Sequence, residues 1–325
     1  MRTGEIWNLV AETPLVKIPS LSEKTGCEIY AKVEYVNPGA SIKDRAAKQI
    51  ILDAEFSGKL KKGMTIYEGT AGNTGIGLAT FAIPRGYKVV ITMPSNQAPE
   101  KFKMLEALGA KVIAVAPCPF ANPVHFYHQA RTFSEADPQG FWANQFENLS
   151  NFRAHYETTG PEIWQQTQGA IDVFVCASGT GGTIGGVSRY LKEKNSKIEV
   201  HLVDPMGSGL YQYLKSGEIK TEGSSVTEGI GIMRLTENFK QAIIDDALRV
   251  DDNEMITMLY HLAQHDGLFV GTSAALNVAA AYKLALRKPG QKIVTILCDH
   301  GSRYQERILS PNWLNEKGLS VRSLF

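Results

Sequence analysis

The chain has 325 residues, of which 43% are hydrophobic and 21% are charged, and its formal net charge is +1. This composition is typical of a globular protein, and the balanced charge gives no reason to expect nucleic acid or a membrane surface as a partner. No apolar run approaches the roughly 20 residues of a membrane-spanning helix, and the first residues lack the pattern of a signal peptide. We therefore expect a cytoplasmic protein.

The four cysteines are far apart in the sequence, with neither the spacing of a zinc site nor that of a disulfide framework. They are Cys27, Cys118, Cys176 and Cys298. Cys176 and Cys298 lie in apolar runs typical of buried strands, where a cysteine usually serves as a small hydrophobic residue. We expect no metal site and no cysteine nucleophile.

Short apolar runs alternate with helical patterns along the chain. Strands are expected at 29–34, 64–67, 88–93, 111–115, 172–176, 198–203 and 292–297. Helices are expected at 43–57, 73–84, 97–108, 159–168, 183–194, 252–266 and 273–287. Several strand runs are apolar throughout, which is typical of parallel strands covered on both faces. This order predicts an α/β protein with two open twisted sheets and helices on both faces of each.

The pattern also suggests two domains. A smaller α/β domain is expected at 45–150, and a larger one is expected from 1–44 together with 151–325. Segment 117–158, rich in Pro, Asn and aromatic residues, is expected to be the least regular part. Gly86 and Gly109 follow helical patterns where a C-cap glycine belongs, and Asn195 occupies the equivalent position after the helix at 183–194.

The first chemically informative segment is Asn37-Pro38-Gly39-Ala40-Ser41-Ile42-Lys43-Asp44-Arg45. It predicts a turn into a helix that Ser41 could cap. Lys43 would lie in the first turn, where the helix dipole disfavours positive charge and so favours a neutral, reactive amine. Taken alone, Lys43 is better explained as an exposed surface lysine. Asp44 and Arg45 are expected to pair with other protein groups.

The second segment, Thr70-Ala71-Gly72-Asn73-Thr74-Gly75, connects a predicted strand to a predicted helix. Backbone N–H groups at such a turn favour an anion, and the lack of lysine or arginine suits a carboxylate. A glycine turn capped by Asn73 or Thr74 explains the segment equally well.

The third segment, Gly179-Thr180-Gly181-Gly182-Thr183, also connects a predicted strand to a predicted helix. Its backbone N–H groups, the helix dipole and two threonine hydroxyls favour a phosphate group. The alternative is a tight turn whose glycines serve packing. The spacing matches neither a P-loop nor a dinucleotide-binding motif, so NAD is not expected.

Together with Ser273 in Gly271-Thr272-Ser273-Ala274, these segments resemble the fold-type II pyridoxal phosphate (PLP) enzymes, and within them the cysteine synthase/cystathionine β-synthase family. The resemblance runs from Thr13-Pro14-Leu15 to Gly301-Ser302-Arg303-Tyr304. It includes Gln145-Phe146, Thr158-Thr159-Gly160-Pro161-Glu162-Ile163-Trp164 and Glu228-Gly229-Ile230-Gly231. It implies the fold of the tryptophan synthase β-subunit, with PLP as cofactor.

The resemblance also implies roles for individual residues. Lys43 would carry PLP as a Schiff base and act as the catalytic base. Asn73 would donate a hydrogen bond to the 3′-oxygen of PLP, and Ser273 would meet its pyridine nitrogen. The phosphate would be bound by Gly179, Thr180, Gly181, Gly182 and Thr183. The substrate would be bound by Thr70, Ala71, Gly72, Asn73, Thr74, Gln145 and Gly231.

The implied reaction is a β-replacement, in which O-acetylserine or a similar activated serine reacts with sulfide, through an aminoacrylate, to give L-cysteine. The alternatives are a cysteine desulfhydrase, which would release sulfide, pyruvate and ammonia, and a cystathionine β-synthase-like activity. A PLP-binding partner without turnover is disfavoured by the presence of Lys43. The family resemblance implies a homodimer.

The sequence departs from the usual cysteine synthase pattern at three places. Ala71 replaces the serine of T-S-G-N, and Ser273-Ala274-Ala275-Leu276 stands where S-S-G-A-A is usual. The usual P-S-x-G-E-R-Y is replaced by Cys298-Asp299-His300-Gly301-Ser302-Arg303-Tyr304. None of these changes alters Lys43 or the glycine–threonine loop, so they bear on the substrate and the outcome of the reaction. The form of the second segment resembles a branch that includes desulfhydrases. His300 is interpreted as a packed residue rather than a substrate-selecting one.

Overall fold

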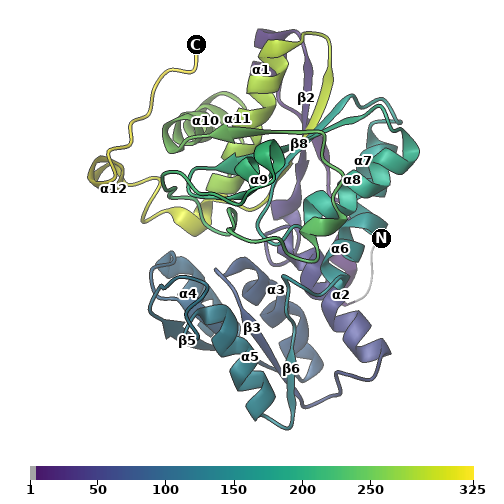
Figure 1. Ribbon diagram of the computed structural model, residues 1–325, viewed down its shortest axis with the longest axis vertical. Coiled ribbons are helices and arrows are strands. Elements are labelled where there is room, and N and C mark those ends of the chain that lie inside the picture. Colours follow the sequence, from purple (N-terminus) through teal and green to yellow (C-terminus); the bar gives the residue numbers. More distant parts are fainter. Residues whose placement is uncertain (1–4) are drawn as a thin grey trace.

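The computed structural model describes residues 5–325, which fold around two β-sheets. Figure 1 shows the larger sheet and its helices above the smaller sheet and its helices. The strand order is β1-β2-β10-β7-β8-β9 in the six-stranded sheet and β5-β4-β3-β6 in the four-stranded sheet. Neighbouring strands are parallel except for β1 and β2, which are antiparallel. The α/β architecture with two open sheets is confirmed.

The strands carry the following bounds. The six-stranded sheet contains β1 (Leu15–Lys17), β2 (Glu28–Val33), β10 (Lys292–Leu297), β7 (Val173–Ala177), β8 (Glu199–Pro205) and β9 (Asp246–Val250). The four-stranded sheet contains β5 (Lys111–Val115), β4 (Lys88–Pro94), β3 (Thr65–Gly69) and β6 (Gly140–Trp142).

Helices cover both faces of the six-stranded sheet (Figure 1). One face carries α1 (Pro19–Thr25), α10 (Asp252–His265) and α11 (Thr272–Arg287). The other carries α7 (Gly160–Gln166), α8 (Gly182–Lys194) and α9 (Leu210–Ser216). Each face has its own buried hydrophobic cluster, so every residue of the central strand β7 is buried. This explains why the central strands are apolar throughout.

The four-stranded sheet is covered in the same way. One face packs against α2 (Lys43–Phe56), α3 (Asn73–Ala82) and α4 (Pro99–Ala107), and the other against α5 (Phe126–Ala136). The short α6 (Ser150–Ala154) continues through a π-helical turn, His155–Thr159, into α7 and so joins the two halves. Near the end of the chain lies α12 (Pro311–Glu316).

Some local expectations were wrong. Segment 117–158 is more regular than expected, because α5 and α6 form within it and His125 caps α5 by accepting a hydrogen bond from the Tyr127 N–H at 3.3 Å. The strands β1, β6 and β9 and the helices α1, α9 and α12 were also not predicted from the sequence. Asn195 does end α8, but with extended rather than left-handed backbone, because its side chain instead accepts a hydrogen bond from the Lys197 N–H. The domain boundaries at 44/45 and 150/151 remain a prediction.

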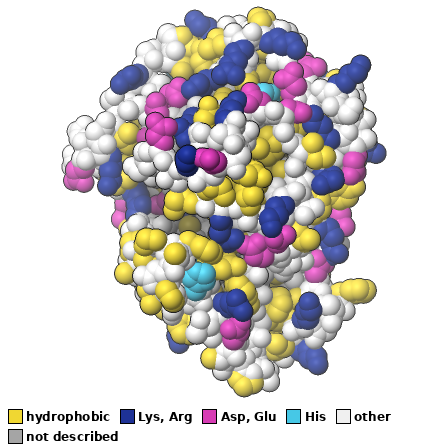
Figure 2. Space-filling model, viewed as in Figure 1, with side chains coloured by type: hydrophobic (Ala, Val, Ile, Leu, Met, Phe, Trp, Pro, Cys, Tyr) yellow, Lys and Arg dark blue, Asp and Glu magenta, His cyan; other side chains and the backbone are white. Residues whose placement is uncertain are grey.

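The topology places functional loops at one edge of each sheet. Parallel strands end at the same edge, and ligands of open α/β sheets bind beyond these carboxyl ends. Loop 70–72 follows β3, and loop 178–181 follows β7. On the face in Figure 2, acidic and basic side chains are interspersed rather than gathered by sign. Within residues 5–325, no helix is long and apolar enough to span a membrane.

Candidate active site

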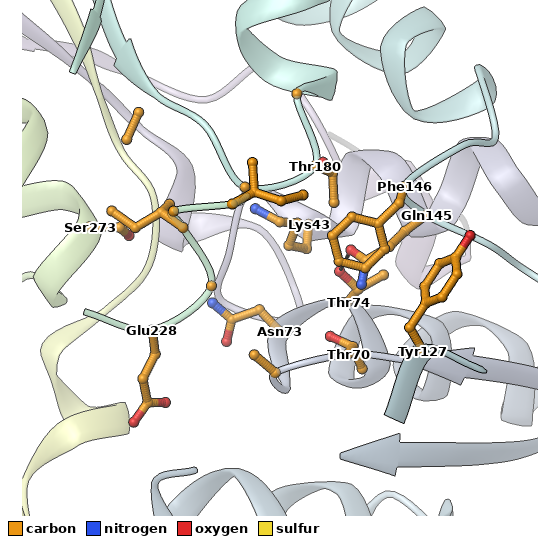
Figure 3. Close-up of a pocket in the computed structure, with 18 of the residues that line it drawn as sticks. Lys43, Thr70, Asn73, Thr74, Tyr127, Gln145, Phe146, Thr180, Glu228 and Ser273 are labelled. Carbon is orange, nitrogen blue, oxygen red and sulfur yellow. Dashed lines mark hydrogen bonds between the residues drawn. The ribbon is translucent and has the colours of Figure 1, made fainter. Parts of the chain in front are cut away.

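A cavity of about 350 Å³ lies where the loops that follow β3, β7 and β10 meet. The structure brings most of the predicted site residues to its walls. These are Lys43, Thr70, Ala71, Asn73, Thr74, Gln145, Gly179, Thr180, Gly181, Thr183, Gly231 and Ser273. Figure 3 shows Lys43 between Ser273 and Thr180, with Asn73 and Thr70 on the adjacent side. Of the predicted residues, only Gly72 and Gly182 do not line the cavity.

Lys43 is the first residue of α2 and lines the cavity half-buried, so the explanation as an exposed surface lysine was wrong. Its backbone N–H donates to the Ser41 hydroxyl at 3.3 Å, and the Ile42 N–H donates to the carbonyl oxygen of Cys298 at 2.8 Å. Ile42 rather than Ser41 occupies the N-cap position. The backbone that leads to Lys43 is therefore anchored to the end of β10.

The neighbouring Arg45 is structural, as expected. Its guanidinium lies 2.7 Å from Glu34 and 2.6 Å from Glu162, and its side chain is almost completely buried. Charge-assisted pairs of this kind hold the start of α2 against α7 and against the turn Glu34–Val36 that follows β2.

Loop 70–74 forms the side of the cavity opposite the six-stranded sheet. Thr74 donates a hydrogen bond to the side-chain oxygen of Gln145 at 2.5 Å, and the Thr70 hydroxyl accepts one from the Gly72 N–H at 3.1 Å. Gly72 itself occupies the N-cap position, so neither Asn73 nor Thr74 caps α3. The loop therefore presents amides and hydroxyls to the cavity, which suits a carboxylate ligand.

Lys101 is an unpredicted neighbour of this loop. A Cβ on Gly72 would lie 2.6 Å from Cδ of Lys101, and the backbone there is left-handed, with φ at 129°. Glycine is therefore required at position 72 both by its conformation and by the close approach of Lys101. The sequence pattern could not reveal this contact because Lys101 belongs to the next helix, α4.

The last two residues of the glycine–threonine loop, Gly182 and Thr183, begin α8, and the first turn of α8 contains no acidic residue. Thr180 is fixed by two hydrogen bonds: its hydroxyl accepts from Asn151 at 2.8 Å, and its carbonyl accepts from Thr236 at 2.7 Å. Gly181 takes a left-handed conformation with φ at 87°. This rigid helix N-terminus is suited to a phosphate group.

His155 lies behind the same loop and was not predicted. Its ring nitrogens lie 2.9 Å from the Thr159 hydroxyl and 3.3 Å from the Thr183 hydroxyl. Burial, followed by the nearby charges of Arg45 and Lys43, holds the pKa of His155 well below its usual value. A neutral imidazole therefore orients the Thr183 hydroxyl.

Ser273 lies in the first turn of α11, on the wall opposite Thr180 (Figure 3). One turn later, Asn277 ties α11 to two strands, since its side chain accepts from the Ala177 N–H and donates to the Ile296 carbonyl, both at 2.8 Å. Ser273 is thereby held at a defined place between the ends of β7 and β10.

Three cysteines also line the cavity, Cys118, Cys176 and Cys298. Burial raises the pKa of Cys298 to about 11 and that of Cys176 well above its usual value. Both thiols are therefore protonated near neutral pH, in agreement with the expectation that neither is a nucleophile.

The outer part of the cavity is lined by aromatic residues, most of which were not predicted from the sequence. It contains Phe120, His125, Tyr127 and Phe146, together with Arg234. The Arg234 guanidinium lies 4.5 Å from the ring centre of Phe120 and 5.0 Å from that of Tyr127, and it pairs with Glu147. The aromatic residues of 117–158 were the available signal, but their pattern does not show which of them face a cavity.

His300 does not line the cavity. Its ring packs edge-on against Tyr35 and Phe269, with ring centres 5.4 and 5.2 Å apart. This agrees with the interpretation of His300 as a packed residue.

Comparison with known proteins decides the family. The profile of the family described as "Pyridoxal-phosphate dependent enzyme" matches residues 6–299. This chain belongs to the pyridoxal-phosphate dependent enzymes. It is 49% identical to the cysteine synthase of Dictyostelium discoideum over 97% of this chain and 86% of that protein. It is 48% identical to cysteine synthase 1 of Neurospora crassa over 98% of this chain and 85% of that protein. The cysteine synthase/cystathionine β-synthase group within the family is thereby confirmed.

Two solved structures share the fold of this PLP enzyme. An O-acetylserine dependent cystathionine beta-synthase from Helicobacter pylori is 34% identical, with a TM-score of 0.85 over 94% of this chain and 98% of that one. A hydrogen sulfide-producing enzyme from Fusobacterium nucleatum is 33% identical, with a TM-score of 0.86 over 93% of this chain and all of that one.

The residues present fit PLP. The N-terminus of α8, free of acidic residues in its first turn, suits the phosphate, and the Ser273 hydroxyl lies on the opposite wall. The Lys43 side chain lies between them (Figure 3). The volume of about 350 Å³ is that of a small-molecule site.

Proposed function

We propose that this enzyme forms L-cysteine from O-acetylserine, or a similarly activated serine, and sulfide. The observation that carries the proposal is the placement of the Lys43 amine in one cavity with two separate anion-binding turns, one at α3 and one at α8. A PLP enzyme that acts on an amino acid needs both, one for the cofactor phosphate and one for the substrate carboxylate. When bound, PLP supplies an electron-withdrawing ring that stabilises negative charge on the substrate α-carbon.

The protein groups would divide the work as follows. Loop 70–74 and Gln145 hold the substrate carboxylate with amides and hydroxyls. The Lys43 amine removes the α-proton as a general base. The bond from the β-carbon to the acetate oxygen breaks, and acetate leaves. Hydrosulfide then forms the new carbon–sulfur bond, and Lys43 returns a proton to the α-carbon.

Ser273 contributes to the choice of reaction. A neutral hydroxyl at the pyridine nitrogen does not force that nitrogen to be protonated, as a carboxylate would. The ring then withdraws electrons less strongly, which disfavours transamination and leaves loss of a β-substituent accessible. The phosphate is assigned to loop 179–183, and the 3′-oxygen is assigned to Asn73.

A second candidate is β-elimination of cysteine to sulfide, pyruvate and ammonia. Ala71 supports it, because the serine hydroxyl usual in cysteine synthases is missing from the wall that would face the substrate carboxylate. The structural likeness to a hydrogen sulfide-producing enzyme supports it as well. Cystathionine formation from a serine derivative and homocysteine is supported by the likeness to the Helicobacter pylori enzyme.

Product analysis of the holoenzyme tests these candidates. The enzyme receives O-acetylserine with sulfide, O-acetylserine with homocysteine, or cysteine alone. Cysteine as the dominant product of the first feed supports the proposal. If pyruvate and sulfide from cysteine alone dominate instead, the enzyme is a cysteine desulfhydrase. If cystathionine from O-acetylserine and homocysteine dominates, the enzyme is a cystathionine β-synthase.

We further propose a homodimer in the cytoplasm, with a smaller domain at 45–150 and a larger one formed by 1–44 and 151–325. The family resemblance supports the dimer, and the separate hydrophobic clusters around the two sheets support the division. The four cysteines are unpaired, which suits a reducing compartment. Because a relative in Saccharomyces cerevisiae is named a putative mitochondrial cysteine synthase, cell fractionation should test cytoplasm against mitochondrion.

A further inference from the structure

The side-chain amide of Asn73 is held at both ends by the segment that follows β10. Its nitrogen donates a hydrogen bond to Oδ2 of Asp299 at 2.7 Å, and its oxygen accepts one from the guanidinium of Arg303 at 2.6 Å. Asn73 begins a helix of the four-stranded half, whereas Asp299 and Arg303 belong to the six-stranded half. These bonds therefore cross between the two halves beside the cavity.

The charges of the two partners determine which way the amide points. Asp299 is fully buried and Arg303 is 4% exposed, so solvent screens neither charge appreciably. A reversed amide would place its oxygen against the carboxylate and its N–H groups against the guanidinium, which is repulsive at both ends. The amide nitrogen carries two hydrogens, and Asp299 accepts one of them. The second remains available to a ligand in the cavity that Asn73 lines.

The same segment also anchors the backbone before Lys43. Ser41 forms an antiparallel bridge with Asp299, and Arg303 donates a hydrogen bond to the carbonyl of Gly39. One short turn thus fixes the approach to the cofactor-binding lysine and the orientation of Asn73.

Asp299 has little freedom to leave this position. The Tyr304 hydroxyl donates to the same Oδ2 atom at 2.6 Å. A Cβ on Gly271 would lie 2.1 Å from Oδ1, so the carboxylate is packed directly against that glycine. Serine, the usual residue at position 299 in cysteine synthases, is one atom shorter and could not span this gap in the same way.

We propose that Asp299 and Arg303 are positioning residues that hold the Asn73 amide with one N–H directed to the 3′-oxygen of PLP. Neither residue lines the cavity, so both act through Asn73. The inference rests on the proposed placement of PLP and extends it to a pair of residues in the turn where this sequence departs from the family pattern.

A double-mutant cycle tests the proposal. Asp299→Ala, Asn73→Ala and the double variant are purified as holoenzymes, and the absorption spectrum of bound PLP and the dissociation constant for PLP are measured. Each single change should weaken PLP binding about tenfold, the effect of one hydrogen bond to a partly charged group, and should alter the visible absorption band. Because Asp299 acts through Asn73, the double variant should bind PLP no more weakly than Asn73→Ala alone.

Tyr304→Phe is the matched control, since it removes the other hydrogen bond to Asp299 and keeps the ring. It should change the spectrum less than Asp299→Ala does, because the carboxylate is still packed against Gly271 and still accepts from Asn73. If Asp299→Ala fails to fold, Arg303→Lys is used instead, because it alters the hydrogen bond to the amide oxygen of Asn73. It should give the same spectral change. Additive losses in the double variant, or unaltered spectra in both single variants, would overturn the inference. If the spectra and PLP affinities change as expected but the enzyme makes no cysteine, the proposed reaction is wrong, and the positioning of Asn73 by Asp299 and Arg303 still stands.

Discussion

At the residue scale, the position of Lys43 explains why this lysine, among many, is the one proposed to carry the chemistry. It is the first residue of α2, its backbone is tied to Ser41, and its side chain lines the cavity. A lysine elsewhere on the same helix lacks this placement: the Lys48 amine instead donates to the carbonyl of Trp7.

Replacing Lys43 with alanine should therefore remove both the covalent attachment of PLP and the catalytic base. We expect loss of the visible PLP absorption and a fall in turnover of at least about 10²–10⁴-fold. Lys48→Ala is the matched control and should keep the spectrum and the rate. A Lys43→Ala enzyme with normal absorption and turnover would refute the assignment.

Ala71 is the change from the family pattern that lies on the cavity wall nearest the proposed carboxylate site. Ala71→Ser should add one hydrogen bond to that carboxylate and raise the ratio of cysteine synthesis to cysteine breakdown, by up to about tenfold. Ala177→Ser, which adds the same hydroxyl on the β7 side of the cavity, is the control. The ratio of cysteine formed to pyruvate released is the measurement. An equal ratio in Ala71→Ser and wild type would exclude a role of this position in the choice of reaction.

Glu68 should make stability depend on pH. Burial, opposed by hydrogen bonds from Gln145, raises the pKa of Glu68 from 4.5 to about 8. Between these values the folded protein retains a proton that the unfolded chain loses, so the free energy of unfolding falls as pH rises through this window. Glu68→Gln should remove this contribution. The thermal midpoint is measured near pH 4.5 and near pH 8 for both proteins, and its fall between the two pH values should be smaller in the variant than in wild type. An equal fall would contradict the raised pKa of Glu68.

At the scale of elements, each turn proposed to bind an anion joins the end of one strand to the start of one helix. At α8 the first residue, Gly182, packs on Asn151, and a Cβ there would lie 2.0 Å from the Asn151 side-chain oxygen. Asn151 in turn holds the Thr180 hydroxyl. Space for this contact exists only because position 182 has no side chain.

Gly182→Ala should therefore displace Asn151 and release Thr180, weakening PLP binding by about tenfold or more. Gly140→Ala in β6 is the control, because its Cβ would lie 2.3 Å from the carbonyl oxygen of Ser134, in the four-stranded half and away from the loop. Both variants should lose thermal stability, and only Gly182→Ala should lose PLP affinity. Equal affinity in the two variants would disprove this dependence.

At the scale of the whole molecule, buried charges join the two halves. The Lys101 amine lies 2.5 Å from Glu228, with side-chain exposures of 2% and 6%, and Arg307 pairs with the other oxygen of the same carboxylate. Arg307 also donates to the carbonyl of Asn96 at 2.7 Å. One carboxylate from the six-stranded half thus compensates two cations, one from each half.

Glu228→Gln should leave both cations without a counter-charge and destabilise the fold by about 3–5 kcal/mol, because breaking a buried pair exposes its full desolvation cost. Glu237→Gln breaks the exposed pair with Lys240 and should cost less than about 1 kcal/mol. The shift in the denaturation midpoint measures both changes. A Glu228→Gln shift no larger than the control would show that the pair does not hold the halves together.

The sequence by itself determined the features that depend on residues close along the chain. Strand, glycine turn and helix follow one another within a few residues at 70–75 and at 179–183, so each turn lies at the carboxyl end of its own sheet. That both turns reach one cavity depends on how the two sheets face each other. Only the tertiary structure decided the contacts between distant residues. Three such contacts join separate elements: Lys101 with Gly72, His155 with Thr183, and Arg303 with Asn73. In the same way, α5 is stabilised by packing on β3, β4 and β6, although the composition of its segment predicted irregular structure. Such contacts leave no periodic trace in the chain, because they depend on where whole elements pack.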